Sequence, residues 1–202
     1  MRKGIMALCL GLIALFGVPA GASLLGPLAM LKRSNDEIRQ ILKQQKGSGP
    51  TSAEKQRIKK IVNGFLDYEE LAKRSLAGQW EKIRAAERAE FVQVFRDLIE
   101  RNYISQLKSN VDYDIEYKDE EVQGNDATVH SLVRTERKGR KAETTIDYKL
   151  TSKEGRWAVY DVITDDVSLL RNYRSQFARI IEREGFPQLL GKMRKKLAET
   201  AD

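Results

Sequence analysis

The spacing of apolar residues changes twice along this 202-residue chain, and these changes limit the folds that it can adopt. From about Lys32 to Asn110, and again after Val167, apolar residues recur every three or four positions, as on one face of a helix. Between about Val111 and Thr164 they alternate with polar residues, as in strands with one buried face. Helices, then strands, then helices again predict an α+β fold.

Short turns divide the segment of strands. Residues 124–126, 138–140 and 154–155 combine glycine with polar residues, a composition typical of tight turns. Strands joined by such short connections pair in antiparallel order. We therefore expect helices packed on one face of a curved antiparallel sheet of about four strands, with an apolar cavity enclosed between the two layers.

Capping residues predict where several helices begin and end. Thr51 and Glu54 have the spacing of a capping box, in which each side chain accepts the backbone N–H of the other residue. Asn35 is the expected start of the preceding helix. Near the C-terminus, Gly185 is expected to end one helix and Pro187 to open the last.

The N-terminal residues indicate export. Two basic residues precede an almost continuous apolar run over 5–18, and Ala20 and Ala22 occupy the positions that a signal peptidase reads. We expect residues 1–22 to be cleaved as a signal peptide, which leaves 23–202 as one domain outside the cytoplasm. An uncleaved anchor is the alternative, although a bilayer span needs ~20 apolar residues.

The chain offers little for catalysis. Its one cysteine, Cys9, lies in the apolar leader, so the exported part would have no thiol nucleophile, no disulfide and no sulfur ligand for a metal. The single histidine, His130, shares a predicted strand face with Thr128 and Leu132, and a zinc site usually needs about three or four ligands. We expect neither a metal nor a cofactor. An enzyme in which His130 and a nearby aspartate act on a small apolar substrate stays open as an alternative.

Two pairs of aspartates have a structural interpretation. Asp112 and Asp114 lie on the polar side of an alternating strand, where solvated carboxylates are expected. Asp165 and Asp166 precede a predicted helix, and acidic residues near a helix N-terminus interact favourably with its dipole. The chain also lacks the glycine-rich phosphate loop, the Gly-x-Ser-x-Gly elbow and the His-Glu-x-x-His zinc motif, so we expect no catalytic residue.

The net charge is modestly positive. The chain has 36 basic and 29 acidic residues, and two of the basic ones lie in the leader. Nucleic acid is an unsuitable partner for an exported protein, so the excess favours contact with anionic lipid head groups or an acidic partner, or serves only solubility. The basic run of Lys192, Arg194, Lys195 and Lys196 is a candidate docking surface, with a solvated helix end as the alternative.

Two segments carry a resemblance to a known family. The first is LDYEELAKRSL at 66–76, followed by Trp80. The second joins WAVYDV at 157–162 to VSLLRNYRSQF at 167–177. In their length and order these segments resemble the family of MlaC, or toluene-tolerance, proteins, and the likeness extends over about 58–197.

This chain departs from the family pattern at three places. Leu66 stands where the family commonly has Phe, and Ala77 stands where it often has Gly, so we expect a different turn before Trp80. Residues 84–86, Arg-Ala-Ala, replace the usual Ser/Thr-Pro-Glu start of the next helix. We expect a weak N-cap there, because neither Arg nor Ala offers a side-chain acceptor to the first turn.

The resemblance implies a carrier. Members of the family are soluble periplasmic proteins that ferry phospholipid between an outer-membrane lipoprotein complex and an inner-membrane ABC transporter whose membrane-anchored subunit carries an MCE domain. Residues 23–202 would then form a single lipid-binding domain in the periplasm. A hopanoid or another lipid as cargo stays open, as does a periplasmic chaperone or adaptor that carries no lipid.

Such a carrier must shield acyl chains from water, because each exposed methylene costs about 0.8 kcal/mol. The helix and strand faces that would point toward a shared interior predict the residues that line the lipid tails. They are Phe91, Phe95, Leu98, Tyr103, Val129, Ile146, Tyr148, Val159, Tyr173 and Phe177. The polar head would stay at the mouth, since burying an unpaired phosphate is costly.

Overall fold

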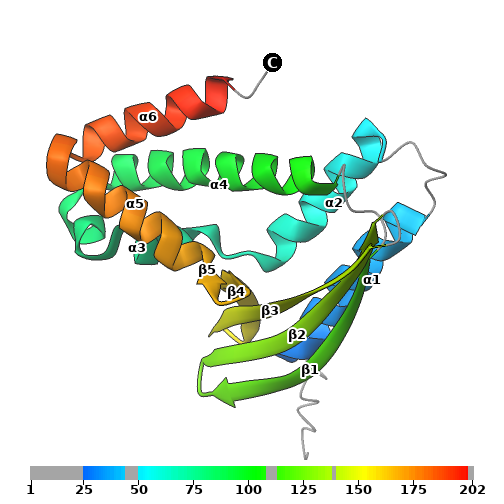
Figure 1. The fold of residues 1–202 in the computed structure, drawn as a ribbon. Helices are drawn as coiled ribbons and strands as arrows, with labels where there is room; N and C mark the ends of the chain where they lie inside the picture. The colour runs from blue at the N-terminus through cyan, green and yellow to red at the C-terminus, as the bar shows by residue number, and fades with distance from the viewer. Residues whose placement is uncertain (1–24, 44–49, 108–112, 138–139, 200–202) are drawn as a thin grey trace, which may run out of the picture.

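The structure, a computed structural model, describes residues 25–43, 50–107, 113–137 and 140–199 (Figure 1). The predicted signal peptide with its cysteine lies outside the described residues, as do residues 138–139 of an expected turn. The described elements run in the order helices, strands, helices. The fold is α+β, as the spacing of apolar residues predicted.

Five antiparallel strands form one sheet in chain order, which is the meander that the short turns predicted. They are β1 (Tyr113–Gln123), β2 (Asp126–Arg137), β3 (Arg140–Lys153), β4 (Arg156–Thr164) and β5 (Val167–Ser168). Four of them correspond to the expected strands, while β5 is a two-residue strand that the sequence did not reveal. Asp165 and Asp166 connect it to β4 with φ angles of 44° and 66°, as a tight hairpin turn requires.

Strand alternation divides the side chains between two faces of the sheet. On the inner face, Val129 lies opposite Tyr148, and Ala127 lies opposite Leu150, in the register of β2 and β3. Val159 of β4 is the partner of Leu150 on its other side. All of these except Tyr148 are almost fully buried, so the inner face forms part of the core.

Two N-terminal helices, α1 (Pro27–Lys43) and α2 (Ser52–Phe65), pack against the inner face. Leu31 of α1 and Phe65 of α2 belong to the same apolar cluster as the buried strand residues. The two helices also pack against each other through a smaller cluster of their own. They provide the layer of helices that was expected on one face of the sheet.

The two predicted starts of these helices differ in outcome. The capping box is confirmed: the Glu54 N–H donates to Thr51 Oγ1 at 3.3 Å, and the Thr51 N–H donates to Glu54 Oε2 at 2.8 Å. The start expected at Asn35 is wrong, because α1 begins at Pro27, a residue that suits the first helical position. Asn35 lies inside the helix, and its side chain accepts a hydrogen bond from the Tyr113 hydroxyl at 3.1 Å.

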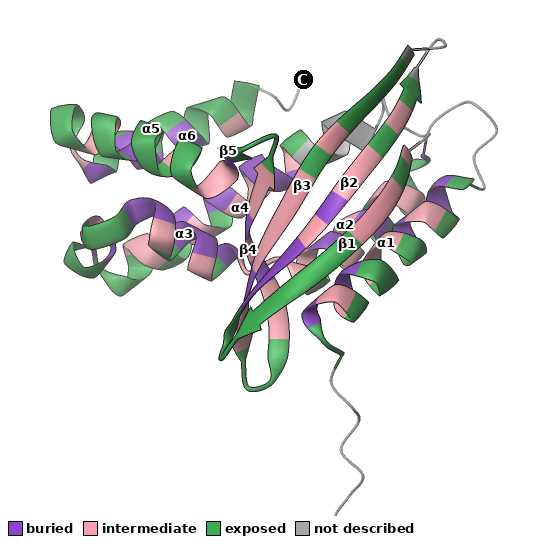
Figure 2. Ribbon diagram, turned by 60° about the horizontal axis from the view of Figure 1, so that its bottom comes forward, coloured by how far each residue is buried: buried purple, intermediate pink, exposed green. Residues whose placement is uncertain are grey.

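The other helices form a second body, here called the helical lobe, beside the β4–β5 edge of the sheet (Figure 2). It contains α3 (Tyr68–Leu76), the 3-10 helix η1 (Ala77–Lys82), α4 (Ala85–Leu107), α5 (Leu169–Glu184) and α6 (Phe186–Glu199). These helices pack around one apolar cluster of their own. Gly185 separates α5 from α6 with a φ angle of 84°, as predicted for a residue that ends a helix.

Candidate functional site

Five of the predicted tail-lining residues meet in the helical lobe. Phe91, Phe95 and Leu98 of α4 lie in one apolar cluster with Tyr173 and Phe177 of α5. Ring centroids are 5.6 Å apart for Phe91 and Phe95, and 4.7 Å apart for Phe95 and Tyr173. Phe91 and Phe95 are fully buried, so other side chains already surround them. A ligand reaches these two rings only if those neighbours move apart.

Three other predicted residues meet on the inner face of the sheet. Val129, Tyr148 and Val159 belong to the apolar cluster that α1 covers. Ile146 lies on the same face of β3, two residues from Tyr148, and is half-buried. The side chain of Tyr103 lies outside the described residues. The structure therefore divides the predicted set between two apolar clusters, one in the helical lobe and one on the sheet.

Leu66 lies where the two clusters meet, and its side chain packs against both of them. Next to it, the Asp67 N–H donates to the Val159 carbonyl at 2.8 Å. The Asp67 carboxylate caps α3 by accepting the Glu70 N–H at 2.9 Å, and it forms an ion pair of 2.8 Å with Lys153 of β3. This first joint fixes the start of the helical lobe to the sheet.

Asp161 forms a second joint between the sheet and the lobe. Its buried carboxylate accepts the Ser168 hydroxyl at 2.7 Å and the Leu170 N–H at 2.9 Å. The Ser168 oxygen in turn accepts the Arg171 N–H at 2.9 Å and so caps α5. Both joints lie in the two sequence segments that carry the family resemblance, which gives those segments a structural role.

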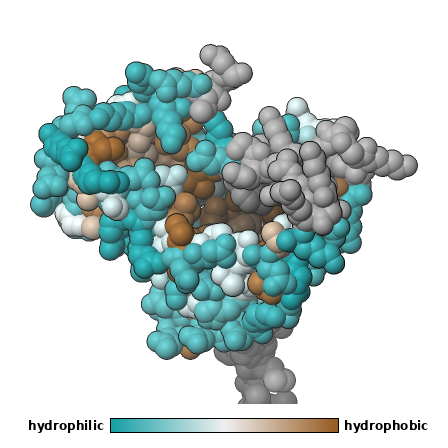
Figure 3. All heavy atoms as spheres, viewed as in Figure 1, coloured by the Kyte–Doolittle hydropathy of each residue, from teal (hydrophilic) through white to brown (hydrophobic). Residues whose placement is uncertain are grey.

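A hollow lies between the two bodies that these joints connect. Figure 3 shows apolar atoms at its floor, in the middle of the molecule between the helical lobe and the sheet. Tyr148 supports the same conclusion: burial raises the pKa of its hydroxyl to about 12, yet its side chain is not sealed from solvent. A side chain that is surrounded by protein and still accessible lies in a concavity.

The apolar surface that the core leaves partly open comes from both clusters. Leu169 and Tyr173 of α5 are half-buried against the lobe cluster, and Tyr148 and Val162 are half-buried against the sheet cluster. Leu169 and Val162 were not among the predicted residues. Strict alternation from Val159 would not have indicated Val162, because a shift of the register between Val159 and Asp161 brings Val162 opposite Tyr148. Together these side chains offer a lining for an apolar ligand.

The outer face of the sheet is polar. His130 Nδ1 lies 2.8 Å from a carboxylate oxygen of Asp147, and His130 Nε2 lies 4.0 Å from Asp119. A cross-strand hydrogen bond on an open sheet face suits a structural role rather than that of a general base that faces a bound substrate. Among the residues that the structure describes, no group of three His, Cys, Asp or Glu side chains is placed to hold a metal ion.

The predicted aspartate pairs have structural roles where they are described. Asp114 accepts a hydrogen bond of 2.8 Å from Arg39 of α1, while Asp112 lies outside the described residues. The interpretation of Asp165 and Asp166 as residues of a helix N-terminus is wrong, because they form the turn between β4 and β5. Within the described ranges, the helices are too short or too polar to cross a bilayer.

Comparisons with known proteins agree with this architecture. The sequence profile of the family described as MlaC protein matches residues 32–195. The intermembrane phospholipid transport system binding protein MlaC of Haemophilus influenzae is 23% identical over 137 residues, which cover 67% of this chain and 64% of the length of that relative. The phospholipid-binding protein of Ralstonia solanacearum, solved in complex with a phospholipid, has a TM-score of 0.72 at 21% identity, over 86% of this chain and 98% of that chain.

The family match extends from α1 into α6 and includes both joints between the helical lobe and the sheet. The likeness to the Ralstonia protein shows that the same α+β fold recurs in a solved structure. The expectation drawn from the two sequence segments is confirmed, and the chain belongs to the MlaC family.

Proposed function

We propose that this protein is a periplasmic lipid carrier, which holds phospholipid in the hollow between the helical lobe and the sheet and catalyses no reaction. The observation that carries the proposal is the apolar floor of that hollow, together with Tyr148 and Tyr173, which are half-buried against the two clusters on either side. Each methylene withdrawn from water contributes about 0.8 kcal/mol, so an acyl chain is a ligand that such a surface binds well. The Haemophilus relative, named for phospholipid transport, and the phospholipid-bound Ralstonia protein support lipid as the ligand class.

The exposure of the predicted lining residues suggests an order of contact. We propose that the acyl chains lie first against Ile146, Tyr148 and Tyr173, which are half-buried. Phe91 and Phe95 are sealed among their neighbours, so contact with them requires the helices of the lobe to separate. The remaining members of the lining set stay predictions: Leu98, Tyr103, Val129, Val159 and Phe177.

The transport route that we propose follows from family membership. The carrier exchanges phospholipid between an outer-membrane lipoprotein complex and an inner-membrane ABC transporter that contains an MCE domain. The expected signal peptide at 1–22 supports a periplasmic location. A hopanoid as cargo would use the same apolar hollow, although its apolar part is a rigid system of fused rings and not a pair of acyl chains.

Catalysis by His130 is the enzymatic alternative, and the location of that residue argues against it. His130 and Asp147 lie on the outer face of the sheet, whereas Ile146 and Tyr148 of the proposed lining lie on the inner face. We expect His130→Ala to leave both lipid binding and lipid transfer between vesicles unchanged. If a folded, lipid-loaded His130→Ala protein lost lipid transfer, the result would contradict the proposal that the carrier catalyses no reaction.

The test is native mass spectrometry of the protein purified from the periplasm, followed by extraction and identification of lipid. We expect a co-purifying diacyl phospholipid. Ile146→Trp should lower the lipid load, because the larger ring occupies the hollow, and Leu132→Trp on the outer face of the sheet is the matched control. A folded protein that carries no lipid, and takes none from donor vesicles, would contradict the proposal and favour a chaperone or adaptor.

A further inference from the structure

The positive charge of this protein is concentrated in two pairs of helices. α1 and α2 together carry eight basic and three acidic residues, and α5 and α6 together carry the same numbers. By contrast, α3 carries two residues of each sign, and β1 carries five acidic residues and one lysine. The charge is therefore polarised, with two basic helix pairs and an acidic edge strand.

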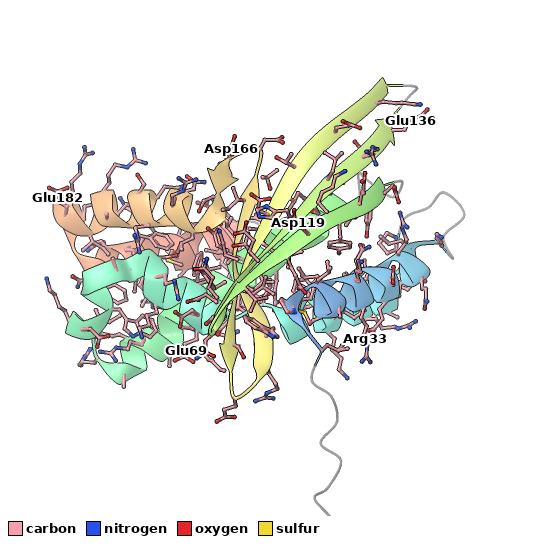
Figure 4. All side chains as sticks on the ribbon, turned by 90° about the horizontal axis from the view of Figure 1, so that it is seen from below. Arg33, Glu69, Asp119, Glu136, Asp166 and Glu182 are labelled. Atoms are coloured by element: carbon pink, nitrogen blue, oxygen red, sulfur yellow. The ribbon has the colours of Figure 1, made fainter. Side chains whose placement is uncertain are left out.

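The two basic helix pairs lie on opposite sides of the hollow. In Figure 1, α1 and α2 lie on the right, α5 and α6 lie on the left, and the hollow of Figure 3 lies between them. Figure 4, a view from below, shows the sheet with Asp119 between α5, marked by Glu182, and α1, marked by Arg33. The acidic strand β1 forms the lower edge of the sheet in Figure 1 and lies against α1, where Asp114 pairs with Arg39 at 2.8 Å.

Several of these cations are available to a partner outside the molecule. Arg57 and Lys60 of α2 are exposed, as are Arg179 and Arg183 of α5. None of the four takes part in an ion pair with any side chain in the described parts of the chain. Each helix pair therefore contributes two cations whose charge no neighbouring carboxylate neutralises by direct contact.

The basic run that the sequence singled out contributes less than its composition indicated. Lys192 forms an ion pair of 2.5 Å with Glu184, and Arg194 lies 3.4 Å from Glu90. These contacts connect α6 to α5 and to α4 and partly neutralise the run. The available charge lies instead on exposed positions of α2 and α5, which the sequence did not single out.

We propose that the two basic helix pairs dock the protein directly onto an anionic membrane surface, with the hollow facing the lipid head groups. A bilayer with anionic lipid is an extended negative surface, which suits cations that are spread over two separate helix pairs. This inference rests on the proposed carrier function, because docking with the hollow toward the membrane brings it to the lipids that a carrier takes up or delivers.

The test is flotation of the lipid-loaded protein with vesicles of phosphatidylcholine alone, or of phosphatidylcholine and phosphatidylglycerol in equal parts. We expect binding to the anionic vesicles only, and we expect added sodium chloride to weaken it. The double reversals Arg57→Glu/Lys60→Glu and Arg179→Glu/Arg183→Glu should each reduce binding by about ten-fold or more. Lys118→Glu/Arg156→Glu, which changes the charge equally on the sheet, is the matched control and should bind nearly as the unchanged protein does.

Two results would overturn the docking surface. One is the absence of binding between the unchanged protein and anionic vesicles. That result would assign the basic helices to an acidic protein partner or to solubility. The other is an equal loss of binding in the sheet control, which would show that only net charge matters. Lipid extraction separates this inference from the proposed function, because cargo without vesicle binding contradicts docking alone, and vesicle binding without cargo contradicts the carrier alone.

Discussion

At the scale of single residues, Ala77 is held in a conformation that suits glycine. Its φ and ψ angles are 47° and −132°, where a Cβ atom is unfavourable and where a type II′ turn normally has Gly. The family pattern, which often has Gly here, agrees with that geometry. We predict that Ala77→Gly raises the free energy of unfolding by about 1 kcal/mol. Urea denaturation measures it, with Ala178→Gly in α5 as a control that should instead lose about 1 kcal/mol.

Glu100 should make the stability of this protein sensitive to acid. Burial alone would raise its pKa, but hydrogen bonds from Lys59, Arg96 and Asn63 outweigh burial and hold the pKa of Glu100 below its ordinary value of 4.5. A carboxyl whose pKa is lower in the folded state contributes stability above its unfolded pKa, and this contribution disappears as the pH falls through the folded pKa.

We therefore predict that Glu100→Gln lowers the free energy of unfolding by about 2 kcal/mol at neutral pH. The difference between this variant and the unchanged protein should shrink as the pH falls below 4.5 and through the lowered pKa of Glu100 in the folded state. Urea denaturation along a series of pH values from neutral to acidic measures the difference, and Glu182→Gln on the exposed side of α5 is the control. A difference that stays constant with pH would show that Glu100 is not ionised in the folded protein.

At the scale of elements, Asp161 is the contact through which β4 holds α5. Its carboxylate accepts two hydrogen bonds in a buried position, from Ser168 and from the Leu170 N–H. In Asp161→Asn an amide NH₂ group replaces one of the two accepting oxygens, so one hydrogen bond is lost and two donors face each other. We therefore predict that this substitution lowers the free energy of unfolding by about 1–3 kcal/mol. Asp166→Asn in the exposed turn should change it by less than about 0.5 kcal/mol. If both variants lost similar free energy of unfolding, the result would contradict a specific stabilising role for the Asp161 carboxylate.

Elements were predictable where a local signal defined them. The turn at Glu154 and Gly155, with φ angles of 52° and 76°, leads directly into β4, whose bounds agree with the sequence prediction. The start of α1 was not predictable in this way, because Asn35 has the chemistry of an N-cap but serves as an acceptor for Tyr113 across the fold. A capping residue reveals a helix end only when no distant partner uses its side chain.

At the scale of the whole molecule, the sequence could not show how the predicted lining would divide. Periodicity identifies which face of an element is apolar, but not which other face will cover it. Phe91, Phe95 and Phe177 have the spacing expected of cavity residues, yet they contact one another inside the helical lobe. Val129 and Val159 are covered by α1 and α2. The hollow lies between these two clusters, which are joined through Leu66, and its position is a property of tertiary packing alone.

That separation leads to the last prediction, which concerns the stability of the loaded carrier. A ligand that fills the gap between two bodies binds only the folded state, so at about 100 times its dissociation constant it stabilises the protein by about 2.7 kcal/mol. For a chain of this size we expect phospholipid to raise the melting temperature of the delipidated protein by about 5–10 °C. Differential scanning calorimetry measures the shift, which should be smaller in Ile146→Trp and complete in Leu132→Trp. Equal shifts in the two variants would mean that the lipid binds elsewhere, because only the first substitution narrows the space between the sheet and the helical lobe.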